Sequence, residues 1–299
     1  MNDYWISVVL GLIEGLTEFL PVSSTAHLRI GEALLSISLQ DPYWKMYTIV
    51  IQMGAILAIT LLFLGRILEF FRTFPHGEDG LHSVWNHPLA MTAGAFVVTA
   101  IPSLLLVDSI GEHLESMRFM AWALIVGGVV MWAVDAWSAR HESRVQDIEQ
   151  MKMPQALWIG FCQIASAAFP GTSRSMATIA GGQLVGTTRS AALEFSFLLS
   201  IPTMFAATLY DLAKALWPER FQAFSLGLGG GSHEAIAPVT IDAHGWVLLA
   251  IGFFVSFVVA LGVVEWFLHW VRGHGFVLFA LYRLVVGILL LTLGLRLGT

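Results

Sequence analysis

The sequence EGLTEFLPVSSTAH, residues 14–27, interrupts an apolar region that runs from about 4 to 36. Its proline is followed closely by Ser23, Ser24 and Thr25. A proline followed by several hydroxyl residues does not continue a lipid-facing helix, because proline lacks the backbone N–H. Non-helical backbone at membrane depth is tolerated only where it is buried in protein or lines a wet cavity. We therefore expect a re-entrant hairpin, in which two helices enter and leave by the same side of the membrane.

The sequence PGTSRS, residues 170–175, breaks a second apolar region, 154–188, in the same way. An offset of 149 residues aligns the two regions, and we interpret the match as a trace of duplication. Chance similarity between two apolar stretches is the alternative, but many of the matched residues are polar residues and prolines, which are rare here. The pairs are Gly11 and Gly160, Glu14 and Gln163, Leu20 and Phe169, Pro21 and Pro170, Ser23 and Thr172, and Ser24 and Ser173.

The composition is that of a membrane protein. Of the 299 residues 57% are hydrophobic and 12% are charged, and the mean hydropathy is +0.75; soluble proteins carry roughly 25% charged residues. The net charge of −6 argues against a nucleic-acid partner, because such partners require a surplus of basic residues. We expect an all-α polytopic membrane protein with six transmembrane helices, each near the 20 residues that cross a bilayer. The predicted spans are 47–64, 89–107, 118–138, 191–213, 246–268 and 276–296.

The spans and hairpins form two similar halves of a single membrane domain, 1–299. Residues 1–138 and 154–299 each hold one re-entrant hairpin and three spans. The positive-inside rule places the basic residues between the spans in the cytoplasm: Arg66, Arg72, Arg140, Arg144, Lys152 and Arg272. The loops at 108–117 and 214–245 then face outward, the two hairpins enter from opposite sides, and the halves form an inverted-topology repeat.

Five other positions carry weaker signals. Gln52 and Gly54 lie in the first span, where lining a cavity and packing between helices are equally good interpretations. Glu194 and Asp211 are expected at the two membrane interfaces. Asp135, together with the 139–150 cluster, is expected to form a solvated loop edge.

Glu14 and Glu18 form an acidic pair inside an apolar helix. Their spacing of four residues places both side chains on one helical face. Two neighbouring carboxylates are costly to remove from water unless a cation, a proton or a basic partner compensates them. The alternative is that both glutamates reach an interfacial water layer and have no functional role. We expect the pair to hold a divalent metal.

The hydroxyl run Ser23, Ser24 and Thr25 has two compatible interpretations. Such residues cap helix starts by accepting hydrogen bonds from free N–H groups, and a helix N-terminus also attracts the oxygens of an anion such as phosphate. His27 alone would more often be a buried, hydrogen-bonded histidine. Its position after the hydroxyl turn and the two glutamates favours a catalytic role instead.

Arg174 is the corresponding charge in the second hairpin. It lies between Ser173 and Ser175, with Thr178 one turn later. An arginine within an apolar hairpin is costly unless it meets a carboxylate or a phosphate, which its planar fork binds through two parallel hydrogen bonds. We expect these four residues to bind phosphate.

Bringing the two turns together would assemble two carboxylates, several hydroxyls, an imidazole and a guanidinium. This set suits a diphosphate substrate with a divalent metal, carried on a polyprenyl lipid that enters sideways from the bilayer. Ser24 as nucleophile, or a water activated by His27 or Glu18, would attack phosphorus. The alternative is a secondary transporter or lipid flippase that uses the acidic pair, because transporters share inverted repeats and broken helices. A pure carrier, however, has no need for a nucleophile and a phosphate clamp.

Residues 14–27 and the sequence PGTSRSMAT, residues 170–178, together resemble the two signatures of the undecaprenyl-diphosphate phosphatases, also called bacitracin-resistance proteins. The resemblance in length and span layout covers the whole chain. Ala26 and Met176 stand where glycine is common in the family, which puts local packing in doubt and leaves the charged residues intact.

The resemblance implies a bacterial inner-membrane enzyme that converts undecaprenyl diphosphate to the monophosphate, which recycles the lipid carrier for peptidoglycan synthesis and gives bacitracin resistance. It also implies an active site open to the outer (periplasmic) side, Mg²⁺ or Ca²⁺ as cofactor, and a homodimer. By motif position it implies the following roles: Glu14 and Glu18 in metal binding or catalysis, Ser24 and His27 in catalysis, and Ser173, Arg174 and Thr178 in phosphate binding.

Overall fold

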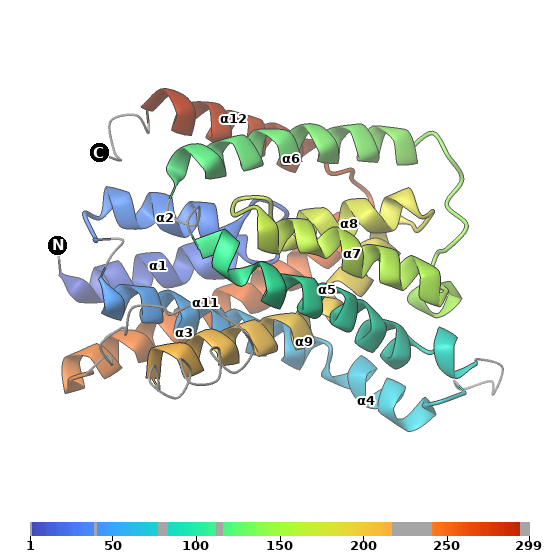
Figure 1. Ribbon diagram of the computed structural model, residues 1–299, viewed down its shortest axis with the longest axis horizontal. Coiled ribbons are helices and arrows are strands. Elements are labelled where there is room, and N and C mark those ends of the chain that lie inside the picture. Colours follow the sequence, from blue (N-terminus) through green and yellow to red (C-terminus); the bar gives the residue numbers. More distant parts are fainter. Residues whose placement is uncertain (1, 39–40, 77–82, 112–115, 217–240, 294–299) are drawn as a thin grey trace.

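The computed structural model describes residues 2–38, 41–76, 83–111, 116–216 and 241–293, and nearly all of the regular structure in these ranges is helical. The long helices lie side by side along the longest axis of the molecule (Figure 1). The helices are α1 (Asp3–Thr17), α2 (Ser24–Leu34), α3 (Pro42–Leu62), α4 (Leu64–Thr73), α5 (Pro88–Gly111), α6 (Met117–Ser138), α7 (Met153–Ala168), α8 (Arg174–Leu184), α9 (Arg189–Leu216), α11 (Ala243–Trp270) and α12 (Val277–Leu293), with two 3-10 turns at Val84–Asn86 and Ile148–Gln150.

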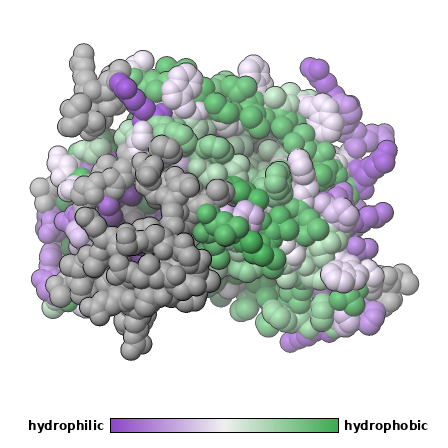
Figure 2. All heavy atoms as spheres, in the orientation of Figure 1, coloured by the Kyte–Doolittle hydropathy of each residue, from purple (hydrophilic) through white to green (hydrophobic). Residues whose placement is uncertain are grey.

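Five of the described helices are long and apolar enough to cross a membrane, namely α3, α5, α6, α9 and α11. They correspond to the first five predicted spans. The sixth predicted span corresponds to α12, whose 17 residues rise only about 25 Å at 1.5 Å per residue; positions 294–296 of that span lie outside the described residues. Figure 2 shows hydrophobic residues across the middle of one face and hydrophilic residues along its right-hand end. The prediction of an all-helical multi-pass membrane protein is confirmed.

Both expected helix breaks are present. The first separates α1 from α2 around Pro21, and the second separates α7 from α8 around Pro170. The four helices α1, α2, α7 and α8 contain 15, 11, 16 and 11 residues, fewer than the about 20 that a helix needs to span a bilayer. The turn of each pair lies in the interior of the helix bundle, where Pro21, Val22, Pro170 and Gly171 are buried.

The two turns end in the same cap. Ser23 and Ser173 precede α2 and α8 with φ angles of 76° and 71°, and each hydroxyl oxygen accepts a hydrogen bond from the N–H three residues later. These matching caps are 150 residues apart, so the predicted pairing of Ser23 with Thr172 is wrong by one residue. The second turn holds Gly171 and Thr172 where the first holds only Val22, and a pattern of matched residues cannot reveal an inserted residue inside a turn.

Glycines let the hairpins pack closely on the long helices. A Cβ added at Gly11 of α1 would lie 2.7 Å from the Gly252 carbonyl oxygen of α11, and one at Gly160 of α7 would lie 2.4 Å from the Ala95 carbonyl oxygen of α5. Gly54 likewise packs against α11, where an added Cβ would lie 2.4 Å from the Phe253 carbonyl oxygen. Of the two interpretations for Gly54, helix packing is therefore the correct one.

Asp135 is buried, and the expectation that it forms a solvated edge is wrong. Its side chain is 2% exposed and accepts hydrogen bonds from Arg189 Nε at 2.7 Å, Gln183 Nε2 at 3.0 Å and the Phe276 backbone N–H at 3.0 Å. A buried carboxylate is stable only when it is paired and hydrogen-bonded in this way. Asp135 therefore joins α6 to α8, α9 and the start of α12, through partners that are distant in the sequence.

Candidate active site

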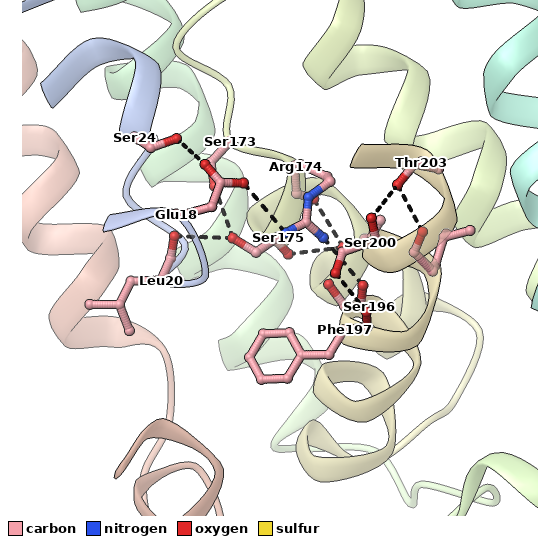
Figure 3. A network of polar contacts seen from close by, with 12 residues as sticks. Glu18, Leu20, Ser24, Ser173, Arg174, Ser175, Ser196, Phe197, Ser200 and Thr203 are labelled. Atoms are coloured by element: carbon pink, nitrogen blue, oxygen red, sulfur yellow. Dashed lines mark hydrogen bonds and ion pairs between the residues drawn. The ribbon is translucent and has the colours of Figure 1, made fainter. Parts of the chain in front are cut away.

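The turns of the two hairpins contact each other. Ser175 Oγ on α8 donates a hydrogen bond to the Leu20 carbonyl oxygen of the first turn at 3.0 Å. Arg174 Nη2 lies 3.7 Å from Glu18 Oε1, which forms an ion pair between the hairpins. Figure 3 shows these groups converging from the two turns and from α9. The expected meeting of the two signature sequences is therefore present.

Glu18 joins a hydroxyl and a guanidinium. The Ser24 hydroxyl donates a hydrogen bond to Glu18 Oε2, while Oε1 faces Arg174. Arg174 Nη1 donates to the Ser196 carbonyl oxygen of α9 at 3.2 Å. Its Nε and Nη2 atoms are buried without a hydrogen-bond partner among the described residues. These two atoms form one edge of the guanidinium, the edge that can bind an oxyanion through two parallel hydrogen bonds.

Glu14 lies one helical turn before Glu18 and is 1% exposed. Neither of its carboxylate oxygens has a hydrogen-bond partner among the described residues, and its carboxyl group interacts with that of Glu18. Two neighbouring carboxylates with unsatisfied oxygens are stabilised by a bound cation.

The described residues include no group of three or more His, Cys, Asp or Glu side chains arranged to hold a metal ion. A pair of carboxylates nevertheless fits Mg²⁺, which proteins commonly bind through one or two carboxylates together with water and substrate phosphates. The donors present at Glu14 and Glu18 are therefore compatible with the expected divalent cation.

A cavity of about 570 Å³ lies where the turns meet. It is lined by residues of both hairpins and by α3, α5, α7 and α9. Six of the predicted site residues line it, namely Glu18, Ser23, Ser24, Thr25, Ser173 and Arg174, whereas the predicted metal ligand Glu14 does not. Gln52 also lines it, which settles the interpretation of that residue in favour of the cavity. Gln163, the predicted counterpart of Glu14, lines the cavity as well, is 2% exposed and has no partner for its amide oxygen among the described residues.

Ser175 and Thr178 lie behind the cavity wall and do not line it. Both are completely buried. Besides its bond to the Leu20 carbonyl oxygen, Ser175 Oγ lies 3.1 Å from Ser173 Oγ. Thr178 Oγ1 lies 2.6 Å from Ser196 Oγ and 2.9 Å from the Arg174 carbonyl oxygen. In this structure their hydroxyls fix the positions of α8, α9 and the first turn.

His27 also lies outside the cavity lining. Its Nδ1 lies 2.7 Å from the Ser23 carbonyl oxygen and its Nε2 lies 2.7 Å from the Tyr282 hydroxyl of α12, with the two rings stacked at a centroid distance of 5.5 Å. A carbonyl oxygen only accepts hydrogen bonds, so Nδ1 carries the proton. In the neutral imidazole Nε2 then accepts a hydrogen bond from Tyr282.

Arg283 is a site residue that the sequence analysis missed. It is 0% exposed, and its guanidinium donates to the Pro21 carbonyl oxygen at 3.1 Å and to the Gly171 carbonyl oxygen at 3.2 Å, one in each turn. Two further bonds reach the carbonyl oxygens of Ala123 and Leu124 on α6. The sequence did contain a signal, because an arginine inside the apolar span 276–296 is costly and marks a function by default.

Comparison with known proteins agrees with the two sequence motifs. Residues 7–289 match the family model described as bacitracin resistance protein BacA. The chain is 56% identical over 296 residues to an undecaprenyl-diphosphatase of Koribacter versatilis, an alignment that covers 99% of this chain and 100% of the relative. It is 40% identical to the undecaprenyl-diphosphatases of Rhizobium etli, covering 97% of this chain and 96% of the relative, and of Thermus thermophilus, covering 94% of each chain. The protein therefore belongs to the bacitracin resistance protein BacA family.

Proposed function

We propose that this chain is an integral-membrane phosphatase that hydrolyses undecaprenyl diphosphate to undecaprenyl phosphate and inorganic phosphate. The observation that carries this proposal is the Nε–Nη2 edge of Arg174, which has no hydrogen-bond partner among the described residues and belongs to a residue that lines the same cavity as the Ser24–Glu18 pair. A phosphate bound to that edge would lie beside a hydroxyl already hydrogen-bonded to a base. The reaction returns the lipid carrier to peptidoglycan synthesis, and the family name implies bacitracin resistance.

The protein binds the terminal phosphate of the substrate through the oxygens of that phosphate. Arg174 holds two of them in a bidentate contact. The hydroxyls of Ser23, Thr25 and Ser173 lie in the same lining and surround the rest of the group. Ser175 and Thr178 support this arrangement from behind by fixing α8 against the first turn and α9.

Ser24 is the nucleophile in this proposal and Glu18 is its base. The Ser24 hydroxyl oxygen bonds to the terminal phosphorus as its proton passes to Glu18, and the bond from that phosphorus to the bridging oxygen breaks. Undecaprenyl phosphate leaves and takes the proton from Glu18. Water then attacks the phosphoserine, gives one proton to the Ser24 oxygen through Glu18 and releases inorganic phosphate. Direct attack by a water molecule activated by Glu18 is the alternative.

Glu14 and Glu18 would hold the divalent cation, Mg²⁺ or Ca²⁺. When bound, the ion neutralises charge on the phosphate oxygens and polarises the phosphoryl group. The two unsatisfied oxygens of Glu14 support this assignment.

We further propose six spans and two re-entrant hairpins arranged as an inverted repeat, in a bacterial inner membrane. The lengths of α1, α2, α7 and α8 support this topology, as does the matching pair of caps at Ser23 and Ser173. The segments 64–73, 139–152 and 271–276 hold the basic residues between the spans and all lie in the right-hand half of Figure 1. By the positive-inside rule this is the cytoplasmic side.

In this topology part of the cavity lies toward the other, outer side. It extends along α5 and α9 as far as Leu104 and Asp211, and these helices end at the left of Figure 1. A homodimer stays a prediction, which native mass spectrometry in detergent tests directly.

The test is phosphate release from undecaprenyl diphosphate in proteoliposomes by the wild type, Ser24→Ala, Glu18→Gln and Arg174→Ala. We expect release by the wild type and its loss in all three variants at unchanged membrane insertion. A phosphoenzyme trapped in the wild type and absent from Ser24→Ala would identify the nucleophile, whereas turnover retained in Ser24→Ala would favour water. No release by folded wild type would reject the phosphatase and favour a carrier that uses the acidic pair.

A further inference from the structure

The cavity extends well beyond the two turns. From Arg174 it continues between α5 and α9, where its walls include Ala100 and Leu104 on α5 and Ala206 and Ala207 on α9. Leu104, Ala206 and Ala207 are exposed, and both helices are long and apolar enough to span a membrane. The space beside the turns is therefore open sideways, between two spans, where the surrounding medium would be lipid.

The hydroxyl residues of this part of the wall offer no free donor. Thr99 Oγ1 donates to backbone carbonyl oxygens of Ala95 at 3.0 Å or Gly160 at 2.7 Å. Ser103 Oγ donates to the Thr99 carbonyl oxygen at 2.7 Å, and Thr203 Oγ1 donates to the Leu199 carbonyl oxygen at 2.8 Å. These three hydroxyl protons are used by backbone carbonyls, so the wall between the turns and the Tyr210–Asp211 end presents mainly methyl and methylene groups to a ligand. This contrasts with the turn end, where Arg174 and Gln163 have unsatisfied polar atoms.

We propose that the opening between α5 and α9 is the prenyl-chain subsite, through which the tail of the lipid diphosphate leaves the cavity for the bilayer. This inference rests on the proposed function. A lipid diphosphate has one polar end and one apolar end, and the cavity likewise joins the polar turns to an apolar side opening at Leu104, Ala206 and Ala207. The small side chains of Ala206 and Ala207 leave room for a chain between the two helices.

A second hollow is an alternative site for the prenyl tail. It measures about 500 Å³ and is lined almost entirely by apolar residues of α6, α7 and α8, among them Val126 and Cys162. Neither Arg174 nor Glu18 lines it, so a tail lying there would have to cross the second turn to keep its diphosphate in the cavity. The opening between α5 and α9 requires no such crossing, because it is part of the same cavity.

The test attaches a bulky group to an introduced cysteine after the protein has folded. Cys162 is the only cysteine of the chain, so Cys162→Ala provides a background in which Ala207→Cys or, as the matched control, Val126→Cys is alkylated with N-benzylmaleimide. Phosphate release is measured from undecaprenyl diphosphate and from the five-carbon dimethylallyl diphosphate. The readout is the ratio of the two kcat/KM values in each protein before and after alkylation.

We expect alkylation at position 207 to lower the ratio of long-chain to short-chain kcat/KM at least tenfold, and alkylation at position 126 to change it less than twofold. A selective long-chain loss at position 126 with none at 207 would move the tail to the second hollow. An equal loss on both substrates at 207 would also overturn the proposal, because the bulk would then act at the diphosphate end. If the unalkylated protein releases phosphate from neither substrate, the proposed function itself has failed.

Discussion

Arg174 Nη2 lies 3.7 Å from Glu18 Oε1, although the two residues belong to different hairpins and are separated by most of the first half of the chain. At this distance the pair is an ion pair without a hydrogen bond. Glu18 therefore compensates the charge of a buried guanidinium and still leaves the Nε and Nη2 hydrogens of Arg174 without an acceptor. These Arg174 hydrogens can therefore be donated to a second anion, such as a phosphate group of the substrate.

Arg174→Lys should lower kcat/KM for the lipid diphosphate roughly 10- to 150-fold. Lysine keeps the positive charge but cannot make two parallel hydrogen bonds, and a hydrogen bond to a charged group contributes about 1.5–3 kcal/mol. Phosphate-release kinetics in detergent measure the effect. Arg140→Lys, at an exposed position, is the matched control. Wild-type kcat/KM in Arg174→Lys would show that charge alone is required there and would contradict the bidentate contact.

Removal of divalent cations should abolish activity, and Glu14→Gln should raise the concentration of Mg²⁺ needed for half-maximal turnover. The amide replaces one charged ligand oxygen by a group that binds hard cations less well. Calorimetric titration of Mg²⁺ into the purified protein gives a readout that is independent of turnover. Glu194→Gln is the control, because that glutamate already pairs with Arg66, whereas neither oxygen of Glu14 has a hydrogen-bond partner among the described residues. Full activity in a chelator would reject the metal site.

The sequence predicted the parts of the site that depend on local rules. A proline before a hydroxyl run breaks a helix wherever it occurs, so the turns near Pro21 and Pro170 could be placed without a structure. The four-residue spacing of Glu14 and Glu18 fixes their common face. The cost of an isolated charge in lipid then predicts that Arg174 meets a carboxylate.

The parts that could not be predicted depend on which helix faces meet. Asp135 was expected in solvent because no neighbour in the sequence explains its burial. Its partners come from distant parts of the chain, Arg189 at the start of α9 and Phe276 just before α12. The direction of His27 depends in the same way on Tyr282 of α12. The one-residue difference between the turns was missed because Ser23 meets a hydroxyl residue in either register, Thr172 at an offset of 149 and Ser173 at 150.

Arg283→Leu should destabilise the protein by several kcal/mol, because it removes the side chain that is hydrogen-bonded to both turns. The substitution removes the side-chain donor of the Pro21 and Gly171 carbonyl oxygens in the two turns, and each unsatisfied buried acceptor costs about 1–3 kcal/mol; the Ala123 and Leu124 carbonyls keep their bonds within α6. Thermal unfolding in detergent, followed by tryptophan fluorescence, measures the change.

Arg272→Leu at an exposed position is the control for Arg283→Leu, and Arg283→Lys should recover only part of the lost stability because one ammonium cannot reach both turns. An Arg283→Leu protein that unfolds at the wild-type temperature would show that other contacts hold the turns together.

His27 and Glu18 compete for the role of base, and the structure suggests how to distinguish them. If Glu18 takes the proton from Ser24, Glu18→Gln should lower kcat by at least about 100-fold, the usual contribution of a general base.

Tyr282→Phe keeps the ring stacked on His27 and removes one neutral hydrogen bond, worth about 0.5–1.5 kcal/mol. It should therefore lower kcat no more than about tenfold. His27→Ala should fall between the two, because it frees the Ser23 carbonyl oxygen and loosens the cap beside Ser24. Pre-steady-state phosphate release measures all three. Should His27→Ala lose as much as Glu18→Gln at unchanged thermal stability, the imidazole is the base and must turn away from Tyr282 during the reaction.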